Sequence, residues 1–140
     1  MPGIARLFLL LSLLAAPIGA RAQSGDAATD ARATIERQLD AFAREDEQAA
    51  YALAAPGIRE RFPDAGQFME MVRLKYAAVL RHRSVDLGAV SVEGDEARER
   101  AVFVDEDNVV WNALYSLHHE ADGRWLITGC VIAKSGDQAL

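Results

Sequence analysis

The sequence predicts an α+β domain in which three N-terminal helices pack on one face of a four-stranded antiparallel meander. Apolar residues recur at helical spacing up to about residue 83, and from Ser84 onward they alternate with polar residues. Turn-forming pairs then divide the second half at Gly94-Asp95, Asp107-Asn108 and Asp122-Gly123. A period of 3.6 followed by a period of two indicates helices first and strands second, which is the order of an α+β fold.

The first 22 residues have the composition of a secretory signal peptide. Arg6 precedes an apolar run from Leu7 to Ala16, and the small residues Ala20 and Ala22 lie just ahead of a cleavage point before Gln23. This is the expected order of a signal peptide, and a run of about ten residues is too short to span a bilayer, which needs roughly 20. We therefore expect a chain exported to the periplasm or secreted, with no membrane insertion after cleavage near Ala22.

The composition limits the partners of the mature chain. Cleavage leaves 118 residues, the size of one domain, which we divide into a flexible start (23–29), a folded domain (30–133) and a C-terminal tail (134–140). Removing Arg6 and Arg21 leaves 13 basic and 21 acidic residues, a net charge of −8. Nucleic acids and anionic membranes bind basic surfaces, so neither is an expected partner.

Two helices are predicted before residue 57. The first spans about 30–44, because Ile35, Leu39 and Phe42 share one helical face. The second spans 47–55, with Asp46 as its N-cap and Pro56 as its stop signal.

The third helix is predicted from Asp64, which forms a capping-box pattern with Gln67, to about residues 81–83. One apolar stripe marks its buried face: Phe68, Met71, Val72, Tyr76 and Val79.

The four strands are predicted over about 84–92, 97–105, 109–120 and 125–133. A two-residue type I′ turn at Asp122-Gly123 places Leu117 opposite Thr128, Tyr115 opposite Cys130 and Ala113 opposite Ile132. Two-residue turns in the other hairpins then predict one apolar face against the helices: Val85, Leu87, Val102, Val104, Trp111, Ala113, Tyr115, Leu117, Leu126, Cys130 and Ile132. No acidic residue falls in the middle of this face.

The opposite face of the sheet is mixed in this register. Its large apolar residues are a candidate interface for a protein partner or for a homodimer: Phe103, Leu114, Trp125, Ile127 and Val131. Scattered exposed apolar residues are also normal on a protein surface, so a free face is the alternative.

Cysteine and histidine usage gives no sign of a metal or cofactor site. Cys130 is the only cysteine, so it cannot form an internal disulfide, and we interpret it as a core thiol. His118 and His119 are adjacent on one strand and therefore point to opposite faces. With no metal-ligand spacing, phosphate loop or nucleophile motif, we expect no metal and no cofactor.

Four stretches resemble a bacterial exported family known as domain of unknown function 4864. They are Gln38–Pro56, Phe68–Leu80, Val110–Leu117 and Gly123–Ile132. The order of elements also resembles the nuclear-transport-factor-two-like superfamily, which implies a cone-shaped fold whose curved sheet wraps a helix layer and often encloses a cavity. The sequence departs from that superfamily between its second and third helices, where only residues 57–62 could form a strand.

The leading functional hypothesis is a binding domain without a catalytic signature, holding either a small apolar ligand between helices and sheet or a protein on the outer sheet face. The expected pocket-lining residues are Tyr51, Tyr76, Trp111, Tyr115 and Cys130. The alternative is a small acid–base enzyme, an isomerase, dehydratase or hydrolase, that uses Tyr115 with Tyr51, Tyr76 or His119. Such chemistry requires a titratable group in an apolar pocket.

Overall fold

A computed structural model describes residues 19–136 as five helices followed by four strands. The prediction of a signal peptide falls mostly on residues 1–18, and the end of the predicted tail on residues 137–140; both lie outside the described residues. The helices and strands are α1 (Gly19–Ala43), α2 (Glu47–Ala52), α3 (Pro56–Arg61), α4 (Ala65–Lys75), α5 (Ala77–Leu80), β1 (Ser84–Glu93), β2 (Glu96–Val104), β3 (Val110–His119) and β4 (Trp125–Lys134).

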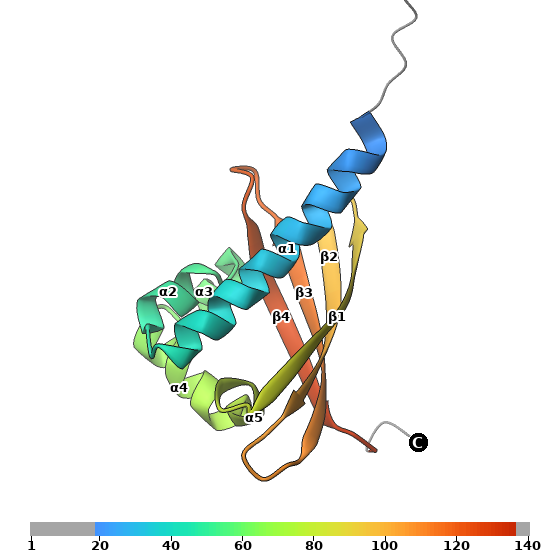
Figure 1. The fold of residues 1–140 in the computed structure, drawn as a ribbon. Coiled ribbons are helices and arrows are strands. Elements are labelled where there is room, and N and C mark those ends of the chain that lie inside the picture. The colour runs from blue at the N-terminus through green and yellow to red at the C-terminus, as the bar shows by residue number, and fades with distance from the viewer. Residues whose placement is uncertain (1–18, 137–140) are drawn as a thin grey trace, which may run out of the picture.

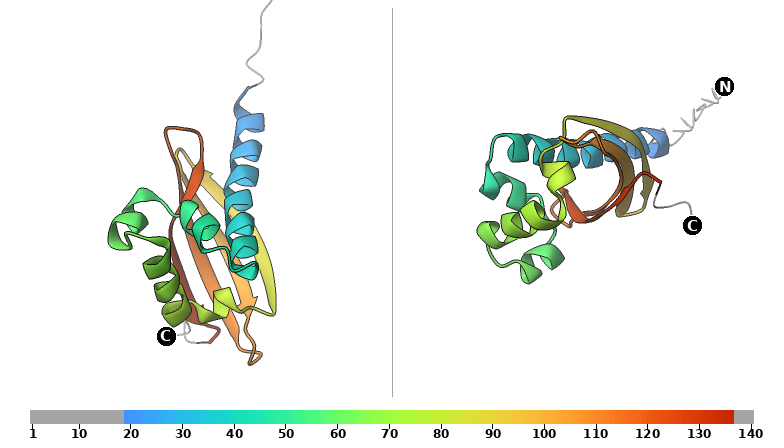
Figure 2. Two further views of the ribbon diagram at one scale, coloured as in Figure 1. Left: turned by 90° about the vertical axis from the view of Figure 1, so that its left-hand side faces the viewer. Right: turned by 90° about the horizontal axis from the view of Figure 1, so that it is seen from below.

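The sheet is an antiparallel meander in the order β1-β2-β3-β4, as predicted. It is strongly curved, and α1 crosses its concave face (Figure 1). The shorter helices α2 to α4 gather beside β4 (Figure 2). All five helices therefore lie on the concave side or at one edge, so the predicted α+β class is confirmed.

The helices differ in detail from the prediction of three. α1 continues through residues 23–29, which were expected to be a flexible start. Pro56 begins α3 instead of only ending α2, because a proline at the first helical position lacks only a backbone N–H that has no helical partner there. Residues 57–62 thus form a helix and its C-cap where the wider superfamily suggested a strand.

The register between β3 and β4 agrees with the prediction at Tyr115 with Cys130 and at Ala113 with Ile132, but Leu117 pairs with Ile127 and not with Thr128. The turn is one residue longer than predicted, since Gly123 (φ +90°) donates its N–H to the carbonyl of Glu120. A bulge at Thr128 takes up the additional residue.

The predicted inward face of β2 is wrong by one residue. Val104 pairs with Val110, so the loop covers residues 105–109 and is longer than a two-residue turn. The Asp105 carboxylate accepts hydrogen bonds from the backbone N–H groups of Asp107 and Val109, and Asn108 adopts φ +60°. This loop chemistry turns Ala97, Glu99, Ala101 and Phe103 inward, because successive side chains on a strand alternate.

Three of the five candidate interface residues are core residues, Phe103 because of the phase of β2 and the other two because the register of β3 with β4 shifts at the bulge. Phe103, Trp125 and Ile127 are buried in the main hydrophobic cluster, while Val131 is 71% exposed and Leu114 is half-buried. Val102, predicted inward, is 38% exposed. The assignment of Phe103, Trp125 and Ile127 to an outer interface is therefore wrong.

Polar contacts fix α1 to the sheet. The Arg32 guanidinium donates from Nε to Glu99 Oε1 (2.7 Å) and from its terminal nitrogen to the carbonyl of Gly88. The Thr34 hydroxyl donates to the carbonyl of Trp125 (2.7 Å). These contacts reach β1, β2 and β4, so the position of α1 is set by several strands at once.

The phase of β2 is testable with two neighbouring substitutions. Phe103→Ala should lower the free energy of unfolding by about 3–5 kcal/mol, because it empties a fully buried site. Val102→Ala should change it by less than about 1 kcal/mol. Chemical denaturation of both variants measures the difference, and a larger loss for Val102→Ala would contradict this register.

Candidate functional site: a cavity beside the edge strand

An apolar cavity of about 310 Å³ lies between the helices and the β4 side of the sheet. Most of its lining is aliphatic or aromatic, and it is contributed by α1, the α2–α3 connection, α3 to α5, β3 and β4. The lining residues are Gln38, Phe42, Ala54, Ile58, Arg61, Phe62, Phe68, Met71, Val72, Lys75, Tyr76, Val79, Tyr115, Ile127, Thr128, Gly129, Cys130 and Val131.

Two tethers connect the helical layer to the edge of β4 and bracket this cavity. At the first, the N–H of Ile127 donates to the carbonyl of Leu53 (2.9 Å), and the N–H of Ala55 donates to the carbonyl of Ile127 (2.8 Å). At the second, the Tyr76 hydroxyl donates to the carbonyl of Cys130 (2.7 Å). Between these two points the helices and β4 are held together without closing on one another.

The helical wall follows from the stripe on α4. Asp64 caps this helix by accepting the N–H of Gln67 (2.8 Å), which fixes its first turn. Phe68 and Val72 then face inward, and Tyr76 is the C-cap of the helix, where its backbone (φ −127°, ψ 33°) separates α4 from α5. That break allows the Tyr76 side chain to reach β4.

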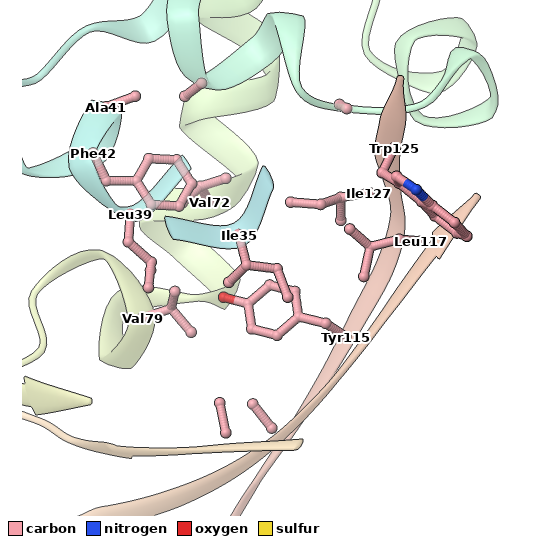
Figure 3. Packing of buried hydrophobic residues seen from close by; sticks show 14 of the residues in the cluster. Ile35, Leu39, Ala41, Phe42, Val72, Val79, Tyr115, Leu117, Trp125 and Ile127 are labelled. Atoms are coloured by element: carbon pink, nitrogen blue, oxygen red, sulfur yellow. The ribbon is translucent and has the colours of Figure 1, made fainter. Parts of the chain in front are cut away.

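Tyr115 and Cys130 provide titratable groups in the sheet wall. Tyr115 enters the core from β3 with its hydroxyl directed towards Val79 (Figure 3). Burial raises the pKa of Tyr115 well above its usual value, and burial raises the pKa of Cys130 to about 12. Both groups are therefore neutral at physiological pH, and Cys130 is a poor nucleophile.

Three of the five predicted pocket residues line the cavity: Tyr76, Tyr115 and Cys130. Tyr51 does not, since its hydroxyl donates to the carbonyl of Phe62 (2.6 Å) and its ring packs on Phe68. Trp111 lies outside the lining as well. Its indole N–H donates to Asp105 Oδ2 (2.9 Å), and the Lys134 ammonium lies 5.6 Å from the centre of its ring.

The histidines do not converge on the cavity. The His119 ring stacks on Trp125 with 4.8 Å between ring centres, and His118 Nδ1 lies 2.7 Å from Glu96 Oε1. The His82 ring nitrogen is 2.7 Å from the carbonyl of Val79. Among residues 19–136, no group of three or more histidine, cysteine or acidic side chains is arranged to hold a metal ion.

Glu99 is the buried acid that the sequence analysis missed. Glu99 is 1% exposed and is the cross-strand partner of Tyr115. Its Oε2 atom has no hydrogen-bond partner among the described residues. Burial raises the pKa of Glu99, and the hydrogen bond and charge of Arg32 oppose that rise. The expectation of no acid in the middle of the inward face was wrong, because it depended on the incorrect phase of β2.

The sequence contained part of the information needed to find the other lining residues. The spacing of the α4 stripe predicts a buried face, but it does not distinguish a cavity wall from a closed core. Arg61 and Lys75, the charged lining residues, gave no pattern beyond basic residues at helix ends.

A family model described as Domain of unknown function (DUF4864) matches residues 24–140. The chain belongs to this family. No curated protein matches its sequence. The family description assigns no activity, so the site has to be interpreted from its own geometry.

Two solved structures of other proteins are similar in fold to this DUF4864 domain. One is described as a "putative ketosteroid isomerase" from Shewanella frigidimarina NCIMB 400, with 14% identity, a TM-score of 0.51, and coverage of 74% of this chain and 94% of that chain. The other is an NTF2-like protein of unknown function from Shewanella baltica OS155, with 8% identity, a TM-score of 0.51, and coverage of 83% and 97%. At these identities the similarity shows the nuclear-transport-factor-two-like fold alone.

Within the described part of the chain, no helix is long and apolar enough to cross a membrane.

The buried carboxyl predicts a pH dependence of stability. Because the folded-state pKa of Glu99 is raised, the native state holds its proton more tightly than the unfolded state. Stability is then lost as pH rises from the ordinary glutamate pKa, about 4.3, through the raised value. Glu99→Gln should remove this loss, so denaturation curves should show the variant gaining stability relative to the wild type as pH rises.

The control is Glu106→Gln, because Glu106 is exposed. A constant difference in stability between Glu99→Gln and the wild type at all pH values would contradict the assignment of the raised pKa to Glu99.

The thiol predicts slow alkylation. At pH 8 the thiolate fraction of Cys130 should be about three orders of magnitude below that of a free cysteine with pKa near 8.5. Iodoacetamide labelling followed by intact mass should show a rate that still rises about tenfold per pH unit above pH 9. The urea-unfolded chain is the control, and equal rates for folded and unfolded protein would refute a partly buried, neutral thiol.

Proposed function

We propose that this protein is an exported binding domain that holds a small, largely apolar ligand in the cavity between its helices and β4. The observation that carries the proposal is the cavity of about 310 Å³, bracketed by the tethers at Ile127 and Tyr76. Its volume lies at the lower end of the roughly 300–1,000 Å³ typical of small-molecule sites.

The energetics of the cavity support a binding role. Apolar surface left uncovered between helices and sheet forgoes about 25 cal/mol for each Å² that packing would bury. Larger side chains along α4 could fill the space, yet this chain places Met71 and Val72 there. A ligand that covers this surface recovers the forgone hydrophobic stabilisation.

Export is part of the proposal. Cleavage after Ala22 would leave α1 beginning at Gln23, and among residues 25–43, where the burial of α1 is described, the first buried residue is Ala31. Cleavage at this point would remove no residue of the core described above. Expression of the full chain in a bacterium with two membranes, followed by intact mass of the osmotic-shock fraction, should give a product that starts at Gln23; an uncleaved product in the cytoplasm would reject export.

Filling the cavity should abolish binding. Met71→Trp replaces a flexible side chain of the lining with a bulky ring and should weaken binding of an apolar fluorescent probe, such as N-phenylnaphthylamine, at least tenfold. Leu74→Trp adds the same ring on the same helix at a position that is 78% exposed and outside the lining, so it should bind as the wild type does. Equal binding by all three proteins would contradict the cavity as the binding site.

A second candidate function is acid–base catalysis on the bound ligand, and one observation favours it. Glu99, with a raised pKa and an unpartnered oxygen, is the cross-strand partner of Tyr115, which lines the cavity. A carboxyl of raised pKa beside an uncharged tyrosine is the combination that proton transfer needs near neutral pH. Glu99 itself is absent from the cavity lining, so the binding role has the stronger support.

The catalytic candidate is tested by turnover of a panel of ketones and lactones. Activity that is lost in both Tyr115→Phe and Glu99→Gln would support it, while unaltered rates in both variants would remove these residues from any such role.

A further inference from the structure

We infer that the ligand is a small amphipathic anion, an apolar carboxylate whose tail lies in the cavity and whose head group lies between Arg61 and Lys75 at its mouth. This inference rests on the proposed binding function and specifies the chemical class of the ligand. It goes beyond the apolar character of the cavity because it assigns a role to the charged side chains of the lining.

The charges of the lining are of one sign. Arg61 and Lys75 are its charged members, and no aspartate or glutamate of the described residues belongs to it. The full chain has 21 acidic and 15 basic residues, a net charge of −6. The cavity mouth, with two cations and no acid, is therefore positively charged, whereas the chain as a whole carries a net negative charge.

Arg61 and Lys75 have no ion-pair partner among the described residues. Two other arginines of the helical layer are paired, Arg73 with Glu47 (2.6 Å) and Arg44 with Asp40 (3.0 Å), whereas Arg59 on α3 makes no ion pair with a described residue. Neither Arg61 nor Lys75 makes an ion pair or a side-chain hydrogen bond with any residue in 19–136. Both side chains are exposed at the opening and free to contact a head group.

Their positions at helix ends explain only part of this arrangement. Arg61 is in the last turn of α3 and Lys75 in the last turn of α4, where a cation stabilises the helix dipole. Arg59 and Arg73 serve the same purpose on the same helices without lining the cavity. The additional cation on each helix is the one that faces the opening.

The positive charge of Arg61 acts on Tyr76, a polar side chain of the cavity lining. The Arg61 guanidinium acts to lower the pKa of Tyr76, against the larger effect of burial, which raises it. The Tyr76 hydroxyl is the tether to Cys130. An anionic head group at Arg61 would thus lie near the end of the apolar wall, with the tail directed towards Tyr115.

Three ligands with the same tail and different head groups test the inference: decanoate, decanol and decyltrimethylammonium. Isothermal titration calorimetry at low salt should give decanoate an affinity about tenfold above that of decanol, with decyltrimethylammonium the weakest. The advantage of decanoate over decanol should shrink at high salt, because exposed charges are screened.

Substitutions at the mouth provide the second measurement. Arg61→Gln and Lys75→Gln should each weaken decanoate by about three- to fivefold, the range of an exposed ion pair, and leave decanol unchanged. Arg98→Gln removes one positive charge from an exposed position on β2 outside the lining and serves as the matched control.

The outcomes separate the two proposals. Equal affinities for decanoate and decanol, or tighter binding of decyltrimethylammonium, would overturn the anion inference and leave the binding function standing. No binding of any of the three by the wild type, or binding that Met71→Trp does not weaken, would overturn both. Loss of decanoate binding in Arg98→Gln equal to that in Arg61→Gln would also refute a head-group site at the mouth.

Discussion

Backbone pairing at the edge of β4 is the constraint on which the site depends. Ile127 exchanges hydrogen bonds with the chain at Leu53 and Ala55, so the loop between α2 and α3 behaves as a short additional strand at one point of the edge. The next connection, from Tyr76 to Cys130, comes only after the bulge at Thr128. Because the α2–α3 connection and Tyr76 are attached to this edge at two separated points, the intervening edge has a gap instead of a closed core.

The lining of the gap and the charges at its opening fit one kind of ligand. The walls are mostly hydrocarbon, the titratable groups in the sheet wall are neutral, and the charge is confined to the opening. A ligand with one apolar end and one anionic end satisfies all three features. Glu99 is separated from this arrangement, since its carboxylate pairs with Arg32 and helps to hold α1 against the sheet.

The sequence was informative where local chemistry decides the structure. Strand positions, the α+β class and the inward positions of Tyr115 and Cys130 follow from alternation and from turn residues. The β2 phase could not be obtained in the same way, because it depends on how the Asp105 carboxylate bonds to its own loop, and a one-residue change reverses every side chain on the strand. The cavity was equally out of reach, since a stripe such as Phe68 and Val72 has the same spacing whether or not another surface closes on it.

The most direct test of this account is a crystal structure of the protein with decanoate bound. The account predicts electron density for the chain of the acid between the tethers at Ile127 and Tyr76, beside Tyr115, with the carboxylate within ion-pair distance of Arg61 or Lys75. Density for decanoate at another surface, or α4 packed directly onto Thr128 and Cys130 with no space between them, would contradict it.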